Sequence, residues 1–321
     1  MTGRRMNRLT GEWVLYSPAR AERPKPSRAP RRPATGPRHD ASCILCPGNE
    51  GALPGITEEV AAADGSLWQT RAVPNKFPIV DDEAGDAGET VRGRHEIVVE
   101  TPRHDLRFAG MADRERALVL EAWRRRFAVL SAMPECEFVA LFRNDGPGAG
   151  ASLSHAHAQI ASLSAVPPAV ARREALMRAH LAATGGCLVC DALRDEEADG
   201  RRIVARRGGL LAFVPYAAQT AYECWIAPIA HAPRFEAVDE TARSALSALL
   251  GETLRRIADC AGDPPWNLVL HAPSRALEER AAHWWLQILP RPGPPGGFEV
   301  ATGLSVAPSL PEADAARLRG D

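Results

Sequence analysis

The stretch SLSHAHAQI at residues 152–160 contains residues whose types and spacing are suited to catalysis. His155, His157 and Gln159 occupy alternate positions, and alternate side chains of a β-strand share a face. A neutral imidazole is a nucleophile once a hydrogen bond at its other ring nitrogen fixes the tautomer, and a carboxamide can donate to a phosphate oxygen. The glycine-rich turn at 145–152 places backbone N–H groups where an anion can approach. The pattern favours phosphoryl or nucleotidyl transfer by His157, with a second metal site or a polar core strand as the alternative.

Two Cys-x-x-C motifs, each followed by two histidines, form an internal repeat. The first histidine follows its cysteines by 58 or 41 residues, and the second follows the first by 51 or 52. Thiolate and imidazole are ligands that zinc prefers, and four protein ligands are typical of a closed structural site. The alternative is inert core cysteines with hydrogen-bonded histidines. We predict two structural Zn²⁺ sites of the Cys₂His₂ type, formed by Cys43, Cys46, His104 and His155 and by Cys187, Cys190, His231 and His283.

The repeat contains a second version of the histidine strand. Residues 283–287 read HWWLQ, so Trp285 stands in the place of His157. An indole cannot attack phosphorus, and the sequence therefore predicts one nucleophile per chain. A gapless alignment of 95–108 with 222–235 places Glu96 over Glu223, and the longer cysteine-to-histidine distance in the first half indicates an inserted loop.

The order of expected elements also repeats along the chain. Hydrophobic periodicity and β-branched content predict helices that alternate with short strands. Pro near the start and Gly at the end of 166–186 indicate a helix that connects the halves. The other expected helices are 113–133 and 239–261, and the expected strands are 70–80, 94–102, 135–144, 155–163, 209–218, 221–229, 266–273 and 282–291.

Composition restricts the classes of function. A formal net charge of −1 over 321 residues argues against a protein that coats nucleic acid or an acidic membrane. The first residues lack a signal-peptide pattern and no apolar run is long enough to span a bilayer, so we expect a cytoplasmic protein with reduced cysteines. Exposed strand edges suggest pairing between chains, as in a homodimer.

Motifs along nearly the whole chain resemble the galactose-1-phosphate uridylyltransferase family, a branch of the histidine-triad superfamily. The second half, from CLVC through AHWWLQI to GGFEVATG, most resembles the subgroup that includes plant-type ADP-glucose phosphorylase. The first half carries LTGEWVLYSPARAERP (9–24), CILCPGNE (43–50), NKFP (75–78), TPRHD (101–105) and FRNDGPGAGASLSHAHAQ (142–159).

This resemblance implies an α+β fold of tandem histidine-triad-like repeats, with antiparallel sheets and packed helices in a half-barrel-like architecture. Residues 1–165 are expected to form the catalytic half and 166–321 a half with a degenerate site. The implied reaction is ping-pong. His157 attacks the α-phosphorus of UDP-glucose, expels the sugar 1-phosphate and passes the nucleotide to a hexose 1-phosphate. The alternatives are ADP-glucose phosphorolysis with inorganic phosphate, nucleotide hydrolysis, and nucleotide binding without catalysis.

The resemblance also assigns roles residue by residue. Cys43, Cys46, His104 and His155 match the family's zinc ligands. Galactose-handling members carry a glutamate near the position of Leu304, and that departure bears on the sugar. The positions that match phosphate contacts are Arg20, Arg23, Ser152 and Gln159, and those on the nucleoside side are Asn75 and Asn144.

Overall fold

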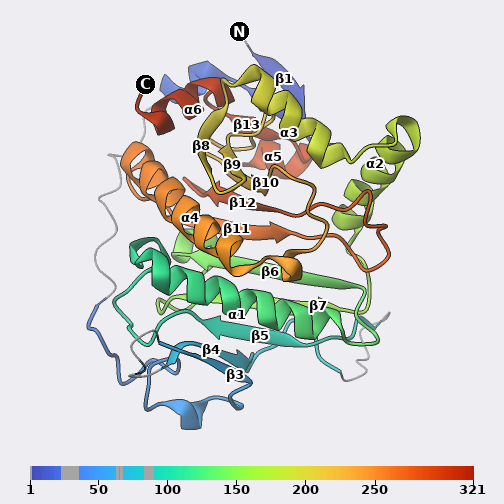
Figure 1. Ribbon diagram of the computed structural model, residues 1–321. Coiled ribbons are helices and arrows are strands. Elements are labelled where there is room, and N and C mark those ends of the chain that lie inside the picture. The colour runs from blue at the N-terminus through green and yellow to red at the C-terminus, as the bar shows by residue number, and fades with distance from the viewer. Residues whose placement is uncertain (1, 23–35, 63–64, 66–67, 83–89) are drawn as a thin grey trace.

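The computed structural model describes residues 2–22, 36–62, 65, 68–82 and 90–321. Within them, one ten-stranded antiparallel sheet runs through the molecule in the order β3-β4-β5-β7-β6-β11-β12-β10-β9-β8 (Figure 1). The first half of the chain contributes β3 (Glu58–Ala61), β4 (Trp68–Pro74), β5 (His95–Val99), β6 (Phe138–Asp145) and β7 (His157–Leu163).

The second half contributes five equivalent strands, which follow one another in the reverse order across the sheet. The halves meet where β6 pairs with β11, with Phe142 opposite Val269. The expected α+β fold of two antiparallel repeats is therefore confirmed, whereas the boundary between residues 165 and 166 stays a prediction. The strands of this half are β8 (Ile203–Arg207), β9 (Leu210–Phe213), β10 (Cys224–Pro228), β11 (Trp266–His271) and β12 (Trp285–Pro290).

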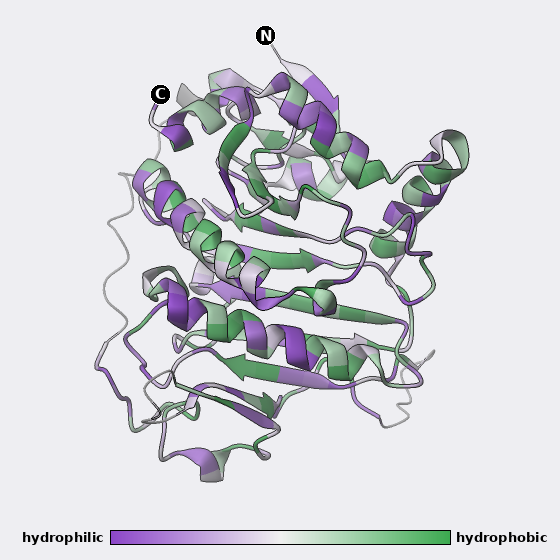
Figure 2. Cartoon of the chain, in the orientation of Figure 1, coloured by the Kyte–Doolittle hydropathy of each residue, from purple (hydrophilic) through white to green (hydrophobic). Residues whose placement is uncertain are grey.

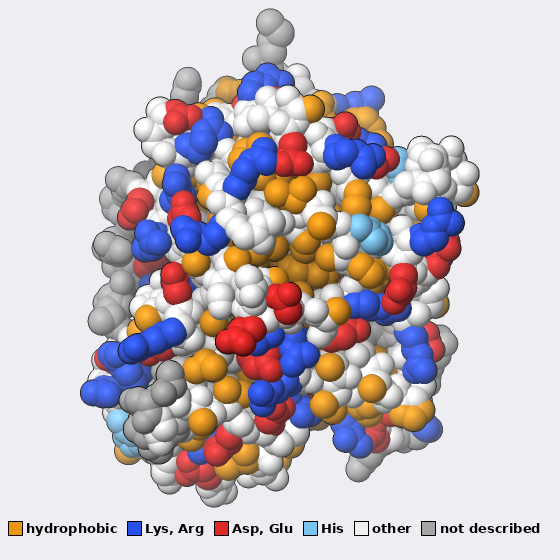
Figure 3. Space-filling view, in the orientation of Figure 1, with side chains coloured by type: hydrophobic (Ala, Val, Ile, Leu, Met, Phe, Trp, Pro, Cys, Tyr) orange, Lys and Arg blue, Asp and Glu red, His pale blue; other side chains and the backbone are white. Residues whose placement is uncertain are grey.

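One face of the sheet is covered by α1 (Asp113–Ser131) and α4 (Glu240–Ala261), which occupy matching places in the two halves and contact each other. Their apolar side chains join the largest hydrophobic core, which includes the fully buried Trp123. Hydrophilic residues lie on their outer surfaces (Figure 2). Basic and acidic side chains are interspersed over this face, in keeping with the near-neutral net charge (Figure 3).

The opposite face of the sheet carries the side chains of His157 and Gln159. In the second half, this face is covered by α2 (Pro168–Thr184) and α3 (Leu188–Asp199). Both termini lie at the second-half end of the molecule. There a small sheet joins β1 (Gly3–Met6), β2 (Trp13–Tyr16) and β13 (Ser305–Ala307), beside α5 (Gly297–Thr302) and α6 (Pro311–Arg319). In the described ranges, none of the helices is long and apolar enough to cross a lipid bilayer.

Several boundaries differ from the sequence prediction. β7 begins at His157 and β12 at Trp285, so His155 and His283 lie in the turns just before these strands. β4 ends at Pro74, because Asn75 accepts the N–H of Phe77 through its side-chain oxygen and turns the chain. The inserted loop is found between β4 and β5, where the segment 75–94 is twice as long as the segment 214–223 between β9 and β10.

The gapless alignment of the two halves is wrong by one residue at β5 and β10. Ile97 pairs with Gln159 and Trp225 pairs with Gln287, so Ile97 and Trp225 are the equivalent residues. The equivalent of Glu223 is therefore His95, not Glu96. Glu96 instead faces α1, where it forms a two-pronged ion pair with Arg126 at 2.7 Å.

Candidate active site and metal centres

The first predicted metal cluster is assembled from three separate parts of the chain. Cys43 and Cys46 lie in a turn, His104 follows β5, and His155 precedes β7. Their ligand atoms all lie within 4.8 Å of one another, and all four residues are buried. Nδ1 of His155 is 3.7 Å from Sγ of Cys43 and 3.6 Å from Sγ of Cys46, and Nδ1 of His104 is 3.5 Å from Sγ of Cys46.

The second cluster has the same construction. Cys187 is the N-cap of α3, and Cys190 lies in the first turn of that helix. This helix was not expected from the sequence. Nδ1 of His231 and Nδ1 of His283 each lie 3.4 Å from Sγ of Cys190, and Cys187 is 4.0 Å from His283. The four ligand atoms again lie within 4.8 Å of one another.

Both donor sets fit a tetrahedral ion. Typical zinc–sulfur and zinc–nitrogen bonds imply a sulfur–nitrogen separation of about 3.5 Å along a tetrahedral edge, close to most of the separations above. Metal-binding histidines also donate their second ring nitrogen to an oxygen. Nε2 of His155 donates to the carbonyl of Thr101 at 2.7 Å, and Nε2 of His283 donates to the carbonyl of Pro228 at 3.1 Å. The two clusters can therefore hold metal ions through Nδ1 of all four histidines.

His157, the predicted nucleophile, is the first residue of β7 and is 5% exposed. Its Nδ1–H donates to the backbone carbonyl of His155 at 2.8 Å. Burial, aided by the charge of Arg143, lowers the pKa of His157 and keeps the ring neutral near pH 7. Among the described residues, no hydrogen bond uses Nε2 of His157, so the lone pair on that nitrogen is free.

On the face of the sheet away from His157, a series of buried ion pairs holds the end of β6. Arg143 contacts Glu100 at 3.0 Å and Asp145 at 2.8 Å, and Asp145 contacts Arg107 at 2.8 Å. Burial raises the pKa of Glu100 to about 7, against the opposing effect of Arg143. Breaking such a buried pair costs about 3–5 kcal/mol, so this chain rigidly fixes the strand from which the glycine turn departs.

The glycine turn after β6 uses part of its backbone on itself. Gly146 and Gly150 adopt positive φ angles of 85°, which favour glycine. The N–H groups of Ala149, Gly150 and Ala151 all donate to carbonyls within the turn. Three of the N–H groups that the sequence analysis offered to an anion are therefore used within the turn itself.

The remaining predicted substrate contacts lie at different distances from His157 along the fold. Asn144 is the last residue but one of β6, where its side-chain oxygen accepts from Asn267 at 2.8 Å, and Gln159 shares the face of His157 two residues along β7. Asn75 follows β4, and Ser152 is exposed on the turn. Arg20 lies in the 3₁₀ turn η1 (Pro18–Glu22), next to the small sheet, and Arg23 lies outside the described residues. Their roles stay predictions.

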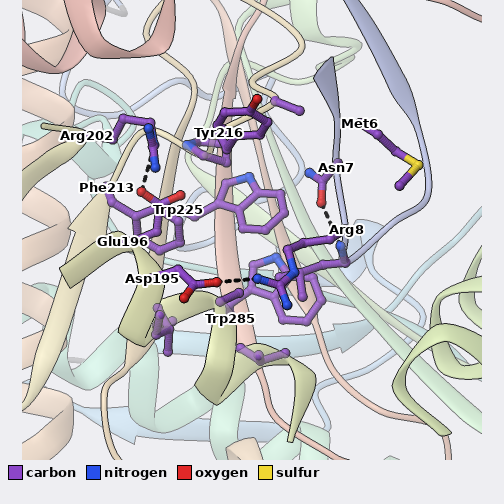
Figure 4. Close-up of a pocket in the computed structure, with 17 residues that line it drawn as sticks. Met6, Asn7, Arg8, Asp195, Glu196, Arg202, Phe213, Tyr216, Trp225 and Trp285 are labelled. Carbon is purple, nitrogen blue, oxygen red and sulfur yellow. Dashed lines mark hydrogen bonds and ion pairs between the residues drawn. The ribbon is translucent and has the colours of Figure 1, made fainter. Parts of the chain in front are cut away.

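The second half contains a cavity of about 270 Å³ over the same face of the sheet (Figure 4). Trp285 and Trp225 form part of its wall, with ring centroids 5.4 Å apart, and the Arg8–Asp195 ion pair lies at its edge. The ring of Trp285 also stacks on His271, with ring centroids 4.7 Å apart. Trp285 thus begins β12 as His157 begins β7, as the repeat predicted, and it contributes an apolar wall at that place.

His95 lies near the site of His157, although no role was assigned to it from the sequence. In the structure its Nε2 lies 3.0 Å from Oε1 of Gln159, and the residue is 4% exposed. The two residues are diagonal neighbours on adjacent strands. Only the pairing register of β5 with β7 could have revealed this contact, and one sequence does not supply that register.

Comparison with known proteins identifies the family. Residues 1–167 match the model of the galactose-1-phosphate uridyl transferase N-terminal domain. The chain belongs to the galactose-1-phosphate uridylyltransferase family. It is therefore a nucleotidyltransferase, as the histidine strand predicted.

Members of this family are similar along most of the chain. ADP-glucose phosphorylase of Arabidopsis thaliana is 30% identical over 96% of this chain and 90% of its own length. Galactose-1-phosphate uridylyltransferase of Streptomyces lividans is 34% identical over 75% of this chain and 64% of its own length.

Solved structures agree in fold. A crystal structure of the Arabidopsis ADP-glucose phosphorylase with bound ADP-glucose superposes with a TM-score of 0.85 at 28% identity, covering 100% of this chain and 99% of that chain. A uridylyltransferase structure superposes with a TM-score of 0.75 at 26% identity, covering 100% of this chain and 98% of that chain.

Proposed function

We propose that the protein moves a nucleoside monophosphate from a nucleoside diphosphate sugar to a phosphate acceptor through a covalent bond to His157. The first candidate reaction takes the nucleotide from UDP-glucose and delivers it to a hexose 1-phosphate. The observation that carries the proposal is the hydrogen bond from Nδ1 of His157 to the carbonyl of His155, which leaves Nε2 as a free base.

The proposed transfer takes place in two steps. Nε2 of His157 attacks the α-phosphorus, a nitrogen–phosphorus bond forms, and the bond from that phosphorus to the bridging oxygen breaks, which releases the sugar 1-phosphate. The Nδ1 proton stays in place and, with the carbonyl of His155, stabilises the charge on the substituted ring. An oxygen of the acceptor phosphate then attacks the same phosphorus, and neutral His157 is regenerated.

Binding the phosphates falls to groups around the start of β7. Gln159 donates from the same face as His157, and Ser152, exposed on the turn, is proposed as a further phosphate contact. Arg20 and Arg23 are proposed as further phosphate contacts, and Asn75 and Asn144 as contacts on the nucleoside side, by the resemblance described above. Donors aimed at the α-phosphate oxygens stabilise the charge that develops there.

We further propose that both clusters hold Zn²⁺. Four protein ligands leave no position for water, so each ion is structural. In the first cluster Zn²⁺, when bound, fixes His155 and hence the carbonyl that orients His157. The expected homodimer and cytoplasmic location stay predictions from the sequence.

A second candidate reaction is phosphorolysis of ADP-glucose. It is supported by similarity to the Arabidopsis ADP-glucose phosphorylase over nearly the whole chain and by that enzyme's structure with ADP-glucose. The sequence agrees with it at one point, because Leu304 stands near the glutamate of galactose-handling members. Both reactions share the attack by His157 and differ in the base and the acceptor.

Steady-state assays with UDP-glucose and ADP-glucose, each with galactose 1-phosphate or inorganic phosphate, test the proposal. We expect parallel-line ping-pong kinetics with one donor and release of glucose 1-phosphate in the absence of acceptor, limited to about one equivalent per chain. Continuous release of free mononucleotide would favour a hydrolase and overturn the proposal, as would nucleotide binding without turnover.

A further inference from the structure

His95 and Gln159 form a hydrogen-bonded pair on the face of the sheet that carries His157. Nε2 of His95 lies 3.0 Å from Oε1 of Gln159. At the other side of the ring, Nδ1 of His95 lies 3.1 Å from the backbone nitrogen of Ile79 and 3.2 Å from Nδ2 of Asn75. All polar atoms of this imidazole are therefore engaged by the chain.

The contact with Ile79 fixes the tautomer of His95. A backbone N–H can only donate, so Nδ1 must accept, and Nε2 must carry the proton. Burial lowers the pKa of His95 and favours the neutral ring that this arrangement requires.

The tautomer in turn fixes the orientation of Gln159. Because Nε2–H of His95 donates, the atom of Gln159 that faces it must be the carbonyl oxygen. The NH₂ group of Gln159 then points away from β5. Among the described residues it has no hydrogen-bond partner, so it is available to a ligand held against His157.

The second half shows the opposite orientation at the equivalent place. Glu223 stands where His95 stands, and it accepts a hydrogen bond from Nε2 of Gln287 at 2.7 Å. The carbonyl oxygen of Gln287 accepts from Nε2 of His271 at 2.8 Å. Both ends of the Gln287 amide are thus used within the protein. The same chain shows that a donor at this position leaves the NH₂ free, whereas a carboxylate captures it.

We propose that His95 is a positioning residue that turns the NH₂ of Gln159 towards a non-bridging oxygen of the α-phosphate. This inference rests on the proposed nucleotidyl transfer through His157. The role of His95 is to make Gln159 a hydrogen-bond donor for an anion, since the reverse orientation of the Gln159 amide would place a carbonyl oxygen against the phosphate.

The test compares His95→Gln with His95→Glu, two side chains of nearly equal size. Gln retains an N–H donor for Oε1 of Gln159, so we expect the single-turnover rate of nucleotidylation to stay within about threefold of wild type. Glu accepts instead and turns the amide as Glu223 turns Gln287. Because one misplaced donor costs about 10²–10³ in rate, we expect a loss of about 100-fold in H95E, chiefly in kcat with KM within a few-fold.

The same substitutions in a Gln159→Ala background separate positioning from charge. If His95 acts through Gln159, H95E in Q159A costs no more than about threefold beyond Q159A alone. A loss in H95E that persists undiminished in Q159A, or equal rates in H95E and H95Q, would overturn the inference. These outcomes are read against an active wild type, and failure of the proposed function itself appears separately, as a wild type that forms no nucleotidyl-histidine.

If H95E does not fold, as judged by its thermal unfolding, His95→Leu replaces it. Leu neither donates nor accepts and leaves the amide free to turn. We expect a loss of about tenfold that disappears in Q159A, and an unchanged rate would contradict the positioning role.

Discussion

Replacing one metal ligand in each cluster in turn tests whether the two clusters have different roles. We expect the first cluster to position His157 and the second only to stabilise the fold. Cys46 and Cys190 occupy the same place in the two repeats, and each lies within 3.6 Å of Nδ1 of the histidine that precedes its strand. Cys46→Ala and Cys190→Ala are therefore matched variants. Each is expected to reduce bound zinc from about two ions per chain to about one.

The expected effects on the reaction differ. In the first cluster, loss of the ion frees His155, whose carbonyl accepts Nδ1–H of His157 at 2.8 Å. A hydrogen bond of about 1 kcal/mol holds the tautomer, and a displacement of about 1 Å at a reacting group can cost 10²-fold. We expect a loss of about 100-fold in the nucleotidylation rate of C46A. In the second cluster the equivalent residue is Trp285, so C190A should stay within about threefold of wild type.

Metal analysis and single-turnover kinetics on the two variants check this prediction, at a temperature where thermal unfolding shows both to be folded. Equal loss of activity in C46A and C190A would refute the reasoning, because it would mean that the first cluster acts only through general stability. Full activity in a C46A protein that has lost its ion would refute it as well.

Three further predictions concern the fold around the site. Trp285→Ala removes a side chain stacked on His271 and should lower the free energy of unfolding by about 3 kcal/mol, while nucleotidylation of His157 proceeds at the wild-type rate; a large loss of rate would contradict the degenerate role of Trp285. Burial raises the pKa of Glu223 to about 6, so the folded state binds this proton more tightly than the unfolded state; the stability of wild type relative to E223Q should fall by about 2 kcal/mol between pH 4.5 and 6 and then level off, and denaturation curves with no such pH dependence would count against it. Gly93→Ala places a Cβ 1.9 Å from the carbonyl oxygen of Ser162 and should cost about 1–3 kcal/mol or more, whereas the control Gly110→Ala meets its nearest neighbour at 3.7 Å and should unfold at nearly the wild-type midpoint; equal midpoints in the two variants would contradict the close approach.

The two Cys/His clusters and the shared face of His157 and Gln159 were predictable from sequence because their signals are local or repeated. The Cys-x-x-C motifs and their histidines occur twice at nearly constant spacing, and the structure brings each set together. The alternation of His157 and Gln159 needs only the period of a strand. Replacement by Trp285 in the second copy could likewise be read from the aligned motif.

The rest depends on pairings that are not local. The role of His95 follows from the register of β5 against β7, and a shift of one residue would place the ring on the other face of the sheet. The same sensitivity explains why the gapless alignment matched Glu96 to Glu223. The true counterparts are offset by one residue at the strand, and the difference is absorbed before His231. The helix α3 was not expected because its first turn carries the Cys-x-x-C motif, which the sequence analysis considered only as a ligand pair.

The central claim is that His157 carries the nucleotide during the reaction. Mass spectrometry of the protein quenched shortly after mixing with UDP-glucose or ADP-glucose, without acceptor, tests it most directly. We expect one acid-labile nucleoside monophosphate per chain, located on the peptide that contains His157, lost on addition of acceptor and absent from His157→Ala. A wild-type protein that turns over substrate without this adduct, or that carries it on another residue, would contradict the role of His157.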